Sequence, residues 1–525
     1  MDRPAGRNAH LLVGNAMRVR YFPAVPVSRY ERKVLIMRCP WFFLSVRRAG
    51  SVLPAALLAL VVTQAATRAA ERPNLLFLIS DDQCFESMGY LGNDELQTPH
   101  LDRLAQRGLV FSHAYNMGSW SGAVCVPSRA MLNTGRFLWN TRTVENELAA
   151  ERAADRLWST QLQAAGYRTY MAGKWHVRLD AASVFDVTGV VRPGMPDVFP
   201  QRHPHAYNRP REGVEDTWDP ADPEEGGFWQ GSHHWSESLA DEAIGFLADA
   251  EEHEQPFFMY IAFNAPHDPR QAPREYLDRY PAESIRVPPN FLPQYPYRDP
   301  IGCPHRLRDE FLAPMPRTEQ AVQVHRSEYY AIVNHMDSQI GRILAALEAS
   351  EHGDNTWVFF TSDHGLAVGQ HGLFGKQNMY DHSVRVPFVV AGPGVPAGEW
   401  VSEPIYYQDV MPTMLELAGA EPHEAVAFQS LLPIIRGERG SNYPSIYTAY
   451  RDLQRAVTRD GWKLIAYPRV PKLRLYHVAE DPRECHDLAD EPDQSDRIRA
   501  LFAELQRWQE ETDDHLDLTA AFPEL

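Results

Sequence analysis

The chain has 525 residues, with 51 Lys and Arg against 69 Asp and Glu, and a formal net charge of −18. The 44% share of hydrophobic residues excludes a disordered chain, and the length predicts two or three packed units. An acidic surface repels phosphate, so nucleic acid is not expected as a partner. The five cysteines, at positions 39, 84, 125, 303 and 485, are too few and too scattered for a disulfide scaffold.

The first 70 residues differ from the rest in charge and in pattern. They hold eleven basic and two acidic residues, so the remainder of the chain carries a net charge of about −27. An apolar core, Val52 to Val62, follows Arg47 and Arg48 and precedes small residues, which is typical of a secretory signal peptide. This core is short for a membrane span, although an N-terminal anchor remains the alternative. We expect Met37 to be the true start and the protein to be periplasmic or secreted, with no stable membrane span once the signal is removed.

The remainder alternates between apolar runs and helical patterns. Short continuous apolar runs, which are typical of strands buried on both faces, occur at Asn74–Ser80, Pro256–Phe263, Trp357–Thr361 and Val386–Ala391. Helical patterns occur at His100–Arg107, Leu157–Ala165, Ser236–Ala250 and Ser327–Ser350. This alternation predicts an α/β fold. The long polar segment from Asp186 to Trp235 is expected to be loop.

The pattern changes near residue 440. Antiparallel strands are expected at Ser445–Tyr450, within Ala456–Tyr467 around a turn at Arg459–Gly461, and at Leu473–Val478, followed by an amphipathic helix over Asp493–Glu511. The expected organisation is therefore an N-terminal extension and signal peptide (1–70), a catalytic domain (71–440) and a C-terminal subdomain (441–525).

Acidic residues follow two of the predicted buried strands. Asp81 and Asp82 follow the first, and Asp363 and His364 follow another. Ligands of open α/β sheets bind outside the carboxyl ends of the strands. Adjacent carboxylates are unfavourable unless a cation lies between them, and an oxygen-rich set suits calcium, magnesium or manganese. A helix cap is the plain alternative for any one such pair.

A second constellation is Cys125-Val-Pro-Ser-Arg129, followed by Thr134-Gly135. Proline favours the first turn of a helix, so Cys125 and Arg129 would share one helical face near a positive helix N-terminus suited to an anion. A lone cysteine is more often a small buried hydrophobe than a nucleophile. The surrounding sequence is what singles this one out.

These motifs together resemble the type I sulfatases of the alkaline-phosphatase-like superfamily, including bacterial arylsulfatases, choline sulfatases and polysaccharide sulfatases. CVPSR followed by TG resembles the family signature in which the cysteine is oxidised to formylglycine (3-oxoalanine). RPNLLFLISDD, GYRTYMAGKWH, TSDHG, GKQNMYDHSVRVP and LYHVAEDPRECHDLA resemble further family elements, so the likeness runs from Arg72 almost to the end. It implies a large, mostly parallel mixed sheet flanked by helices, with a small C-terminal α+β subdomain that contains an antiparallel sheet.

The resemblance also implies roles for individual residues. The divalent cation, expected to be calcium with magnesium or manganese as alternatives, would be held by Asp81, Asp82, Asp363, His364 and a formylglycine oxygen at Cys125. The catalytic group would comprise Cys125, Arg129, Lys174, His176, His267 and Lys376. Arg129 would hold the modified residue, the two lysines would bind sulfate oxygens, and the two histidines would handle protons. Many relatives have asparagine where His364 stands, and His267 lacks a sharp flanking motif.

The implied function is a sulfuric ester hydrolase that cleaves sulfate monoesters. Expected partners are a sulfated small-molecule or carbohydrate substrate and a formylglycine-generating or anaerobic sulfatase-maturating enzyme. A sulfated carbohydrate is favoured because the Asp186–Trp235 segment holds several tryptophans and histidines, although these side chains could equally hold a long loop in place. The alternatives are a phosphomonoester, phosphodiester or phosphonate-ester hydrolase on the same scaffold, and a catalytically inactive protein that binds sulfated glycans.

Overall fold

The first strand of the described chain lies in the middle of the main sheet. The computed structural model describes residues 72–525, and its first strand, β1 (Asn74–Ser80), is buried along its whole length. The predicted signal peptide and the start at Met37 lie outside the described residues. Among the helices within 72–525, none has the length and apolarity required to cross a membrane.

The main sheet of the described chain has eight strands in the order β13-β2-β12-β10-β1-β9-β5-β6. Their bounds are β1 Asn74–Ser80, β2 Leu109–Phe111, β5 Arg168–Lys174, β6 Val187–Arg192, β9 Phe257–Ala262, β10 Thr356–Ser362, β12 Phe388–Ala391 and β13 Glu399–Val401. Within this sheet of the described chain, β12 is antiparallel to both of its neighbours, β10 and β2. All other strand pairs of the same sheet are parallel. The four predicted apolar runs correspond to β1, β9, β10 and β12, and the expected α/β class is confirmed.

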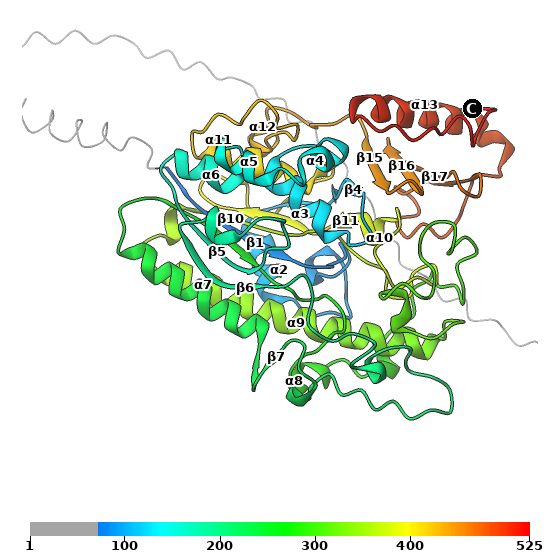
Figure 1. Ribbon diagram of the computed structural model, residues 1–525, viewed down its shortest axis with the longest axis horizontal. Coiled ribbons are helices and arrows are strands. Elements are labelled where there is room, and N and C mark those ends of the chain that lie inside the picture. Colours follow the sequence, from blue (N-terminus) through cyan, green and yellow to red (C-terminus); the bar gives the residue numbers. More distant parts are fainter. Residues whose placement is uncertain (1–71) are drawn as a thin grey trace, which may run out of the picture. The chain divides into compact units, whose positions relative to one another are not determined.

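Helices cover both faces of this sheet (Figure 1). One layer contains α2 (Pro99–Arg107), α7 (Trp235–Glu251), α8 (Arg274–Leu277) and the long α9 (Glu319–Ala349). The opposite layer contains α3 (Cys125–Thr134), α4 (Leu138–Val144), α5 (Leu148–Ala153), α6 (Trp158–Ala164), α11 (Val410–Leu417) and α12 (Leu432–Ile435). The helix expected at Cys125 is α3, whereas the short helices α4 and α5 were not among the predicted elements, because a turn or two of helix leaves no clear period in the sequence.

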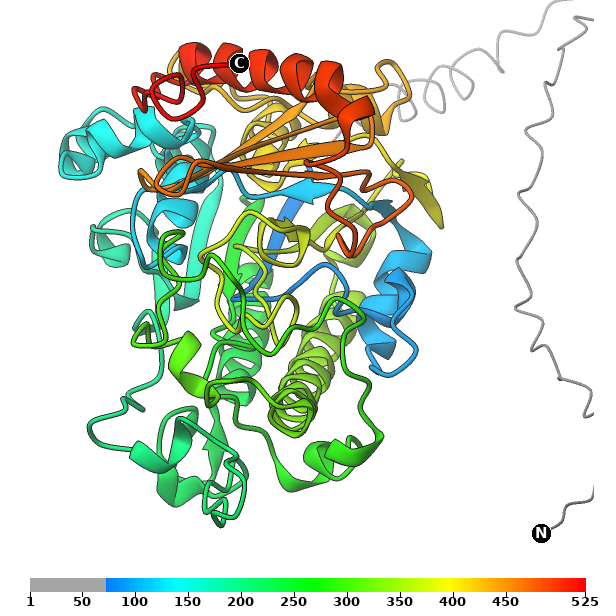
Figure 2. The same ribbon diagram turned by 90° about the vertical axis from the view of Figure 1, so that its right-hand side faces the viewer.

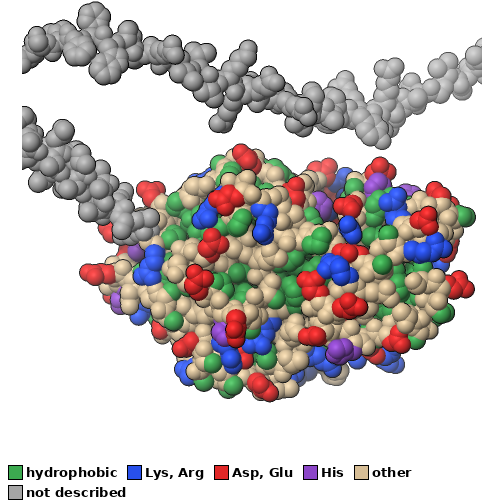
Figure 3. Space-filling model, turned by 90° about the horizontal axis from the view of Figure 1, so that it is seen from above, with side chains coloured by type: hydrophobic (Ala, Val, Ile, Leu, Met, Phe, Trp, Pro, Cys, Tyr) green, Lys and Arg blue, Asp and Glu red, His purple; other side chains and the backbone are tan. Residues whose placement is uncertain are grey.

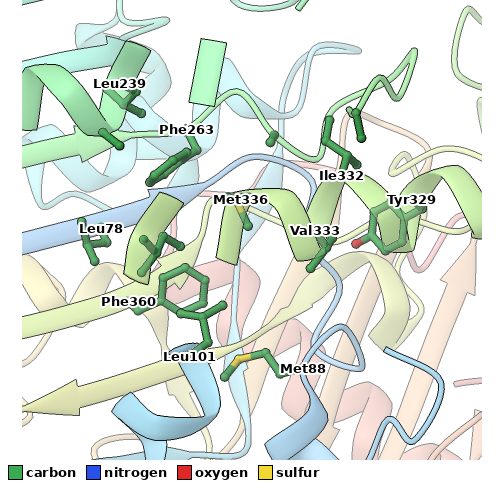
Figure 4. Packing of buried hydrophobic residues seen from close by; sticks show 14 of the residues in the cluster. Leu78, Met88, Leu101, Leu239, Phe263, Tyr329, Ile332, Val333, Met336 and Phe360 are labelled. Atoms are coloured by element: carbon green, nitrogen blue, oxygen red, sulfur yellow. The ribbon is translucent and has the colours of Figure 1, made fainter. Parts of the chain in front are cut away.

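The alternation of side chains along β1 explains why the strand needs both layers. Leu76 and Leu78 point into the core beneath α9, whereas Leu75 and Phe77 point into the core beneath α6 and α11. Successive strand residues face opposite sides of a sheet, so a strand covered on both sides is apolar throughout. Figure 4 shows Leu78 of β1, Phe360 of β10 and Met336 of α9 in this core.

A second sheet of five strands lies at the C-terminal end, beneath α13 (Ser495–Glu511) (Figure 2). Its strands are β15 (Ile446–Tyr450), β16 (Gln454–Arg459), β17 (Trp462–Tyr467), β18 (Lys472–Tyr476) and β4 (Gly118–Ser119). Strands β15 to β18 are antiparallel, as predicted, but β4 comes from the N-terminal half and pairs in parallel with β15. The proposed boundary between residues 440 and 441 remains a prediction.

The remaining elements are short. A three-stranded sheet consists of β3 (Ala114–Tyr115), β11 (Arg385–Val386) and β14 (Ile405–Tyr406), and α10 (Asp381–Val384) leads into β11. The segment from Asp186 to Trp235, expected to be loop throughout, also contains β6, β7 (Trp229–Gln230) and β8 (His233–His234). The expectation was wrong for β6 because this strand lies at the sheet edge and is partly exposed, so it lacks the apolar run of an interior strand.

Candidate active site

The two acidic pairs leave the sheet side by side. Strands β1 and β10 are parallel neighbours, with Ser80 opposite Ser362, so the residues that follow each strand emerge at the same edge. The backbone N–H of Asp82 donates to Asp363 Oδ1 at 3.3 Å, and His364 Nε2 lies 3.1 Å from Asp82 Oδ1. Asp81, Asp82, Asp363 and His364 are all fully buried.

Helix α3 presents Cys125 to this cluster. The helix begins at Cys125, and the Sγ atom lies 3.3 Å from His364 Nε2 and 3.7 Å from Lys376 Nζ. One turn later, the buried Arg129 donates from Nε to Asp363 Oδ2 at 2.9 Å and from Nη1 to the carbonyl oxygen of Lys174 at 2.8 Å. Cys125 and Arg129 therefore face the same site, as their spacing predicted.

Two buried lysines approach the carboxylates from different elements. Lys174, the last residue of β5, forms an ion pair with Asp81. Lys376 lies 2.8 Å from both carboxylate oxygens of Asp82 and 3.3 Å from Nε2 of His267, which follows β9. His267 Nδ1 lies 2.7 Å from the carbonyl oxygen of Asp268, which leaves Nε2 directed toward Lys376. The structure thus brings all of the predicted catalytic and metal residues into one region.

The charges of this cluster shift its pKa values. Burial alone would raise the pKa of Cys125, but Lys174 and Lys376 outweigh it and lower this pKa well below its usual range. Burial also opposes ionisation of Asp82, and the adjacent Lys376 nevertheless holds the pKa of that carboxyl below its usual value. Position 125 is therefore an electropositive place for a nucleophile or an anion.

The acidic residues also suit a divalent cation. Ligand atoms of Asp81, Cys125, Asp363 and His364 all lie within 4.8 Å of one another. Asp81 Oδ1 is buried and has no hydrogen-bond partner within residues 72–525. A buried carboxylate oxygen without a donor is costly, and a cation would satisfy it. Together with Asp82, the carboxylates of Asp81 and Asp363 and the imidazole of His364 form a mainly oxygen donor set that fits a hard cation.

A pocket of about 540 Å³ opens onto Cys125. The pocket residues that the sequence predicted are Cys125, His176, His267 and Lys376; those that it missed include Gly194, Phe199, Arg308, Asp309 and Gln377. Asp309 accepts from Gln377 Nε2 at 2.8 Å, and Arg308 forms ion pairs with both Asp268 and Asp309. Gln377 could have been found from its place beside Lys376, whereas Arg308 and Asp309 belong to no motif.

The tryptophans of the Asp186–Trp235 segment do not line this pocket. Trp218 and Trp229 are buried within the segment, and His205 bonds to Glu225 at 2.9 Å instead of facing the site. These side chains hold the long segment in place. Its contribution to the pocket comes from Gly194 and Phe199 and their neighbours.

Comparison with known proteins agrees with this geometry. The family described as "Sulfatase" matches residues 73–420, and "N-sulphoglucosamine sulphohydrolase, C-terminal" matches residues 369–511. A sulfatase of Formosa agariphila is 27% identical, covering 82% of this chain and 86% of its own length. An N-acetylglucosamine-6-O-sulfatase of Bacteroides thetaiotaomicron is 25% identical, covering 85% and 88%.

Solved structures share the same fold. A protein solved in complex with D-glucosamine-2-N,6-O-disulfate superimposes with a TM-score of 0.65 at 22% identity, covering 85% of this chain and 99% of its own. A phosphonate monoester hydrolase of Agrobacterium radiobacter gives a TM-score of 0.64 at 20% identity, covering 84% and 96%. The family match spans most of the chain and includes the cysteine, both acidic pairs and both lysines. The chain therefore belongs to the sulfatase family and is a sulfuric ester hydrolase with the alkaline-phosphatase-like fold.

Proposed function

We propose that this sulfatase cleaves sulfate monoesters of carbohydrates, using a formylglycine made from Cys125 and one divalent cation. The observation that carries the proposal is the position of Cys125, at the start of α3 between a carboxylate cluster and two buried lysines. Relatives named N-acetylglucosamine-6-O-sulfatase and ulvan-active sulfatase support a sugar substrate. Arylsulfatase and choline-sulfatase relatives define the competing substrates.

The chain's own residues would bind and orient the sulfate group. Lys174 and Lys376 would neutralise charge on the non-bridging sulfate oxygens, where preorganised electrostatics contribute most. Arg129, fixed by Asp363, would hold the residue at position 125 in place. A hydrated formylglycine there would supply one hydroxyl to attack sulfur and displace the alcohol. Loss of the proton from its second hydroxyl would re-form the aldehyde and expel sulfate together with the first oxygen.

The remaining residues would move protons. His267 lies beside Lys376, so either side chain could protonate the departing alcohol. His176 also lines the pocket and would remove a proton from position 125 so that sulfate can leave. The donor set formed by Asp81, Asp82, Asp363 and His364 would hold the cation, proposed to be calcium, which would supply further positive charge at the reacting sulfate.

The modification requires access that the folded protein does not offer. Cys125 is only 2% exposed. A formylglycine-generating or anaerobic sulfatase-maturating enzyme would therefore act before the chain folds. The predicted signal peptide would then direct the protein to the periplasm or the medium.

Mass spectrometry of the Cys125 peptide, combined with turnover of sulfate esters, tests the mechanism. We expect the peptide to be lighter by the exchange of the thiol for an aldehyde oxygen. Cys125→Ala should lose activity by at least about 10³-fold, because no nucleophile remains. The control is Cys485→Ser, at an exposed cysteine outside the pocket, which should keep full activity. An unmodified thiol in fully active protein would refute the formylglycine mechanism.

A substrate panel tests the specificity. Sulfated mono- and oligosaccharides, an aryl sulfate, choline sulfate and a phosphonate monoester should be compared by kcat/KM on the same preparation. The proposal requires a sulfated sugar to be the best substrate. A higher kcat/KM for the phosphonate ester would instead assign the protein to the phosphorus-ester hydrolases of this fold.

A further inference from the structure

A second cleft, of about 870 Å³, lies beside the catalytic pocket. It is formed by α4, the end of β15 and the segment after α13, and its lining includes Trp120, Arg142, Arg451 and Arg455. None of the mechanistic steps above uses this cleft.

One short segment separates the two cavities. Trp120 lines the cleft, whereas Gly122 and Ala123, two and three residues later, line the catalytic pocket. Hydrogen bonds hold this segment from both sides: the backbone N–H of Arg451 donates to Ser119 O at 2.7 Å, and Gln377 Nε2 donates to Gly122 O at 3.1 Å. The segment is partly exposed from Trp120 to Ala123, so a ligand can pass over it from one cavity to the other.

The charges of the cleft favour an anion. Each of its carboxylates has a partner: Asp452 pairs with Arg469, Asp513 accepts from Asn140, and Asp514 pairs with Arg455. Arg142 and Arg451 are both exposed, and neither forms an ion pair with any carboxylate of the described chain. Two guanidinium groups without carboxylate partners therefore face the cleft.

The remaining lining suits a sugar ring. Trp120 is half-buried, and its Nε1 donates to Glu145 Oε2 at 3.2 Å, which fixes the orientation of the indole ring. Aromatic faces pack against apolar ring surfaces, and guanidinium groups bind sulfate or carboxylate oxygens in pairs. A cleft lined by an aromatic ring and by two arginines without carboxylate partners matches an anionic saccharide better than an uncharged one.

We propose that this cleft binds a second, anionic sugar unit of the same glycan whose sulfate ester occupies the catalytic pocket. The placement of the sulfate ester in the catalytic pocket rests on the proposed function. The inference adds that the substrate is a saccharide with at least two anionic groups, sulfate or carboxylate. The two anionic groups bind on opposite sides of the Trp120–Ala123 segment.

Equilibrium binding separates this inference from the catalytic proposal. The probes are sulfated hexasaccharides of carrageenan, ulvan and heparin type, together with a monosulfated monosaccharide. They are titrated calorimetrically into calcium-loaded Cys125→Ala protein, which should not turn them over. In the same background, Arg142→Gln/Arg451→Gln should weaken binding of the best hexasaccharide about ten- to a hundredfold, since each lost arginine contact to an anion contributes a charge-assisted hydrogen bond. Binding of the monosaccharide should not change.

A matched control removes two positive charges elsewhere. Arg152→Gln/Arg211→Gln changes two exposed arginines that line neither cavity, and it should bind the hexasaccharide like the parent. The inference is overturned if no hexasaccharide binds more tightly than the monosaccharide. It is also overturned if the two double variants behave alike, or if the cleft variant loses hexasaccharide and monosaccharide binding equally. Failure of the catalytic proposal appears separately, as absence of turnover of every sulfate ester in the substrate panel by matured protein.

Discussion

At the residue scale, Gly194 shows how narrowly the pocket is built around His176. A Cβ atom added to Gly194 would lie 2.4 to 2.8 Å from three atoms of the His176 ring. Asn264 Nδ2 donates to the neighbouring Pro193 O at 2.9 Å and holds this part of the chain against the site. The glycine thus permits the close approach that fixes the histidine ring, and it acts as a positioning residue.

Gly194→Ala should therefore displace the His176 ring and lower kcat about ten- to a hundredfold, as a misplacement of about 1 Å does in other sites. Steady-state kinetics on an aryl sulfate would measure the effect, with thermal unfolding to check the fold. Gly245→Ala is the control, because a Cβ at this position of α7 meets no atom within 4 Å. Equal kcat in both variants would show that Gly194 does not position the histidine.

The sequence predicted one kind of site residue well and another not at all. Asp81, Cys125 and Lys376 lie in short sequence motifs, and the residues next to them indicate their chemical role. Gly194 and Asp309 reach the pocket only because distant segments fold over it, and no local pattern marks them.

At the element scale, helix α2 receives its N-terminal cap from another helix. Thr98 occupies the N-cap position but its side chain makes no capping hydrogen bond. Asp337, in the middle of α9, instead accepts from the backbone N–H groups of His100 at 3.2 Å and Leu101 at 2.8 Å. A carboxylate satisfies two of the N–H groups that every helix leaves without a partner. The donors and acceptor are more than 230 residues apart, so sequence inspection could predict both helices but not this link between them.

The burial of Asp337 predicts a pH dependence of stability. Burial raises its pKa to about 7, against about 3.9 for an unfolded chain. Between these values the folded carboxyl keeps a proton that the unfolded one has lost, so the free energy of unfolding falls as the pH rises from about 4 to about 7. Asp337→Asn removes this titration. Relative to wild type, the variant should gain about 1–3 kcal/mol between pH 4.5 and pH 8, measured by urea unfolding.

The control variant should remove no titratable group. Ser338→Ala serves, because Ser338 is the next residue of α9 and its hydroxyl donates to the carbonyl oxygen of Asn334. Its difference from wild type should stay constant with pH. If Asp337→Asn gave the same flat difference, the buried carboxyl would not be the group that titrates.

At the scale of the whole molecule, the C-terminal sheet shares a hydrophobic core with helices and short strands of the N-terminal half. One hydrophobic cluster contains Met131 of α3 and Tyr380 together with Leu464 of β17 and Trp508 of α13. The buried Lys463 of β17 also forms ion pairs with Asp381 of α10 and with Glu484. The C-terminal sheet was predictable from its alternating strands, but its attachment to the N-terminal half was not, because β4 has only two residues.

Fragments cut at the predicted boundary should consequently fail to fold alone. Residues 72–440 would expose the apolar surface that now packs beneath β15 and α13, and they should form aggregates or a loosely packed state. Near-ultraviolet circular dichroism and gel filtration would measure this, with 72–525 as the control. A monomeric 72–440 fragment with native tertiary signals would show that the two parts are independent domains.

Chelation should destabilise the whole protein. A cation that binds only the folded state adds about 4 kcal/mol when its concentration is about a thousand times its dissociation constant. We expect EDTA to lower both Tm and activity and calcium to restore them better than magnesium or manganese. Asp363→Asn, which alters the donor set, should show a much smaller calcium-dependent rise in Tm. Equal rises in both proteins would place the calcium elsewhere.

The sequence has a negative net charge, and the surface shows how its charged side chains are distributed. Acidic and basic side chains are interspersed on the face seen in Figure 3, without a field of one sign. An anionic substrate is therefore attracted by the arginines and lysines in and beside the pocket and not by the net charge of the protein. Salt should weaken this attraction where those side chains are exposed and much less where they are buried.

The pairing of β4 with β15 has a consequence for the order of events during synthesis. Gly118 lies so close to Ala449 that no side chain fits between the strands, and Cys125 follows only a few residues later. A ribosome completes the Cys125 region long before it makes β15, and until then this edge of the site has no partner strand. The Cys125 region would therefore remain without this partner strand over more than 300 codons, until the last sixth of the polypeptide is made.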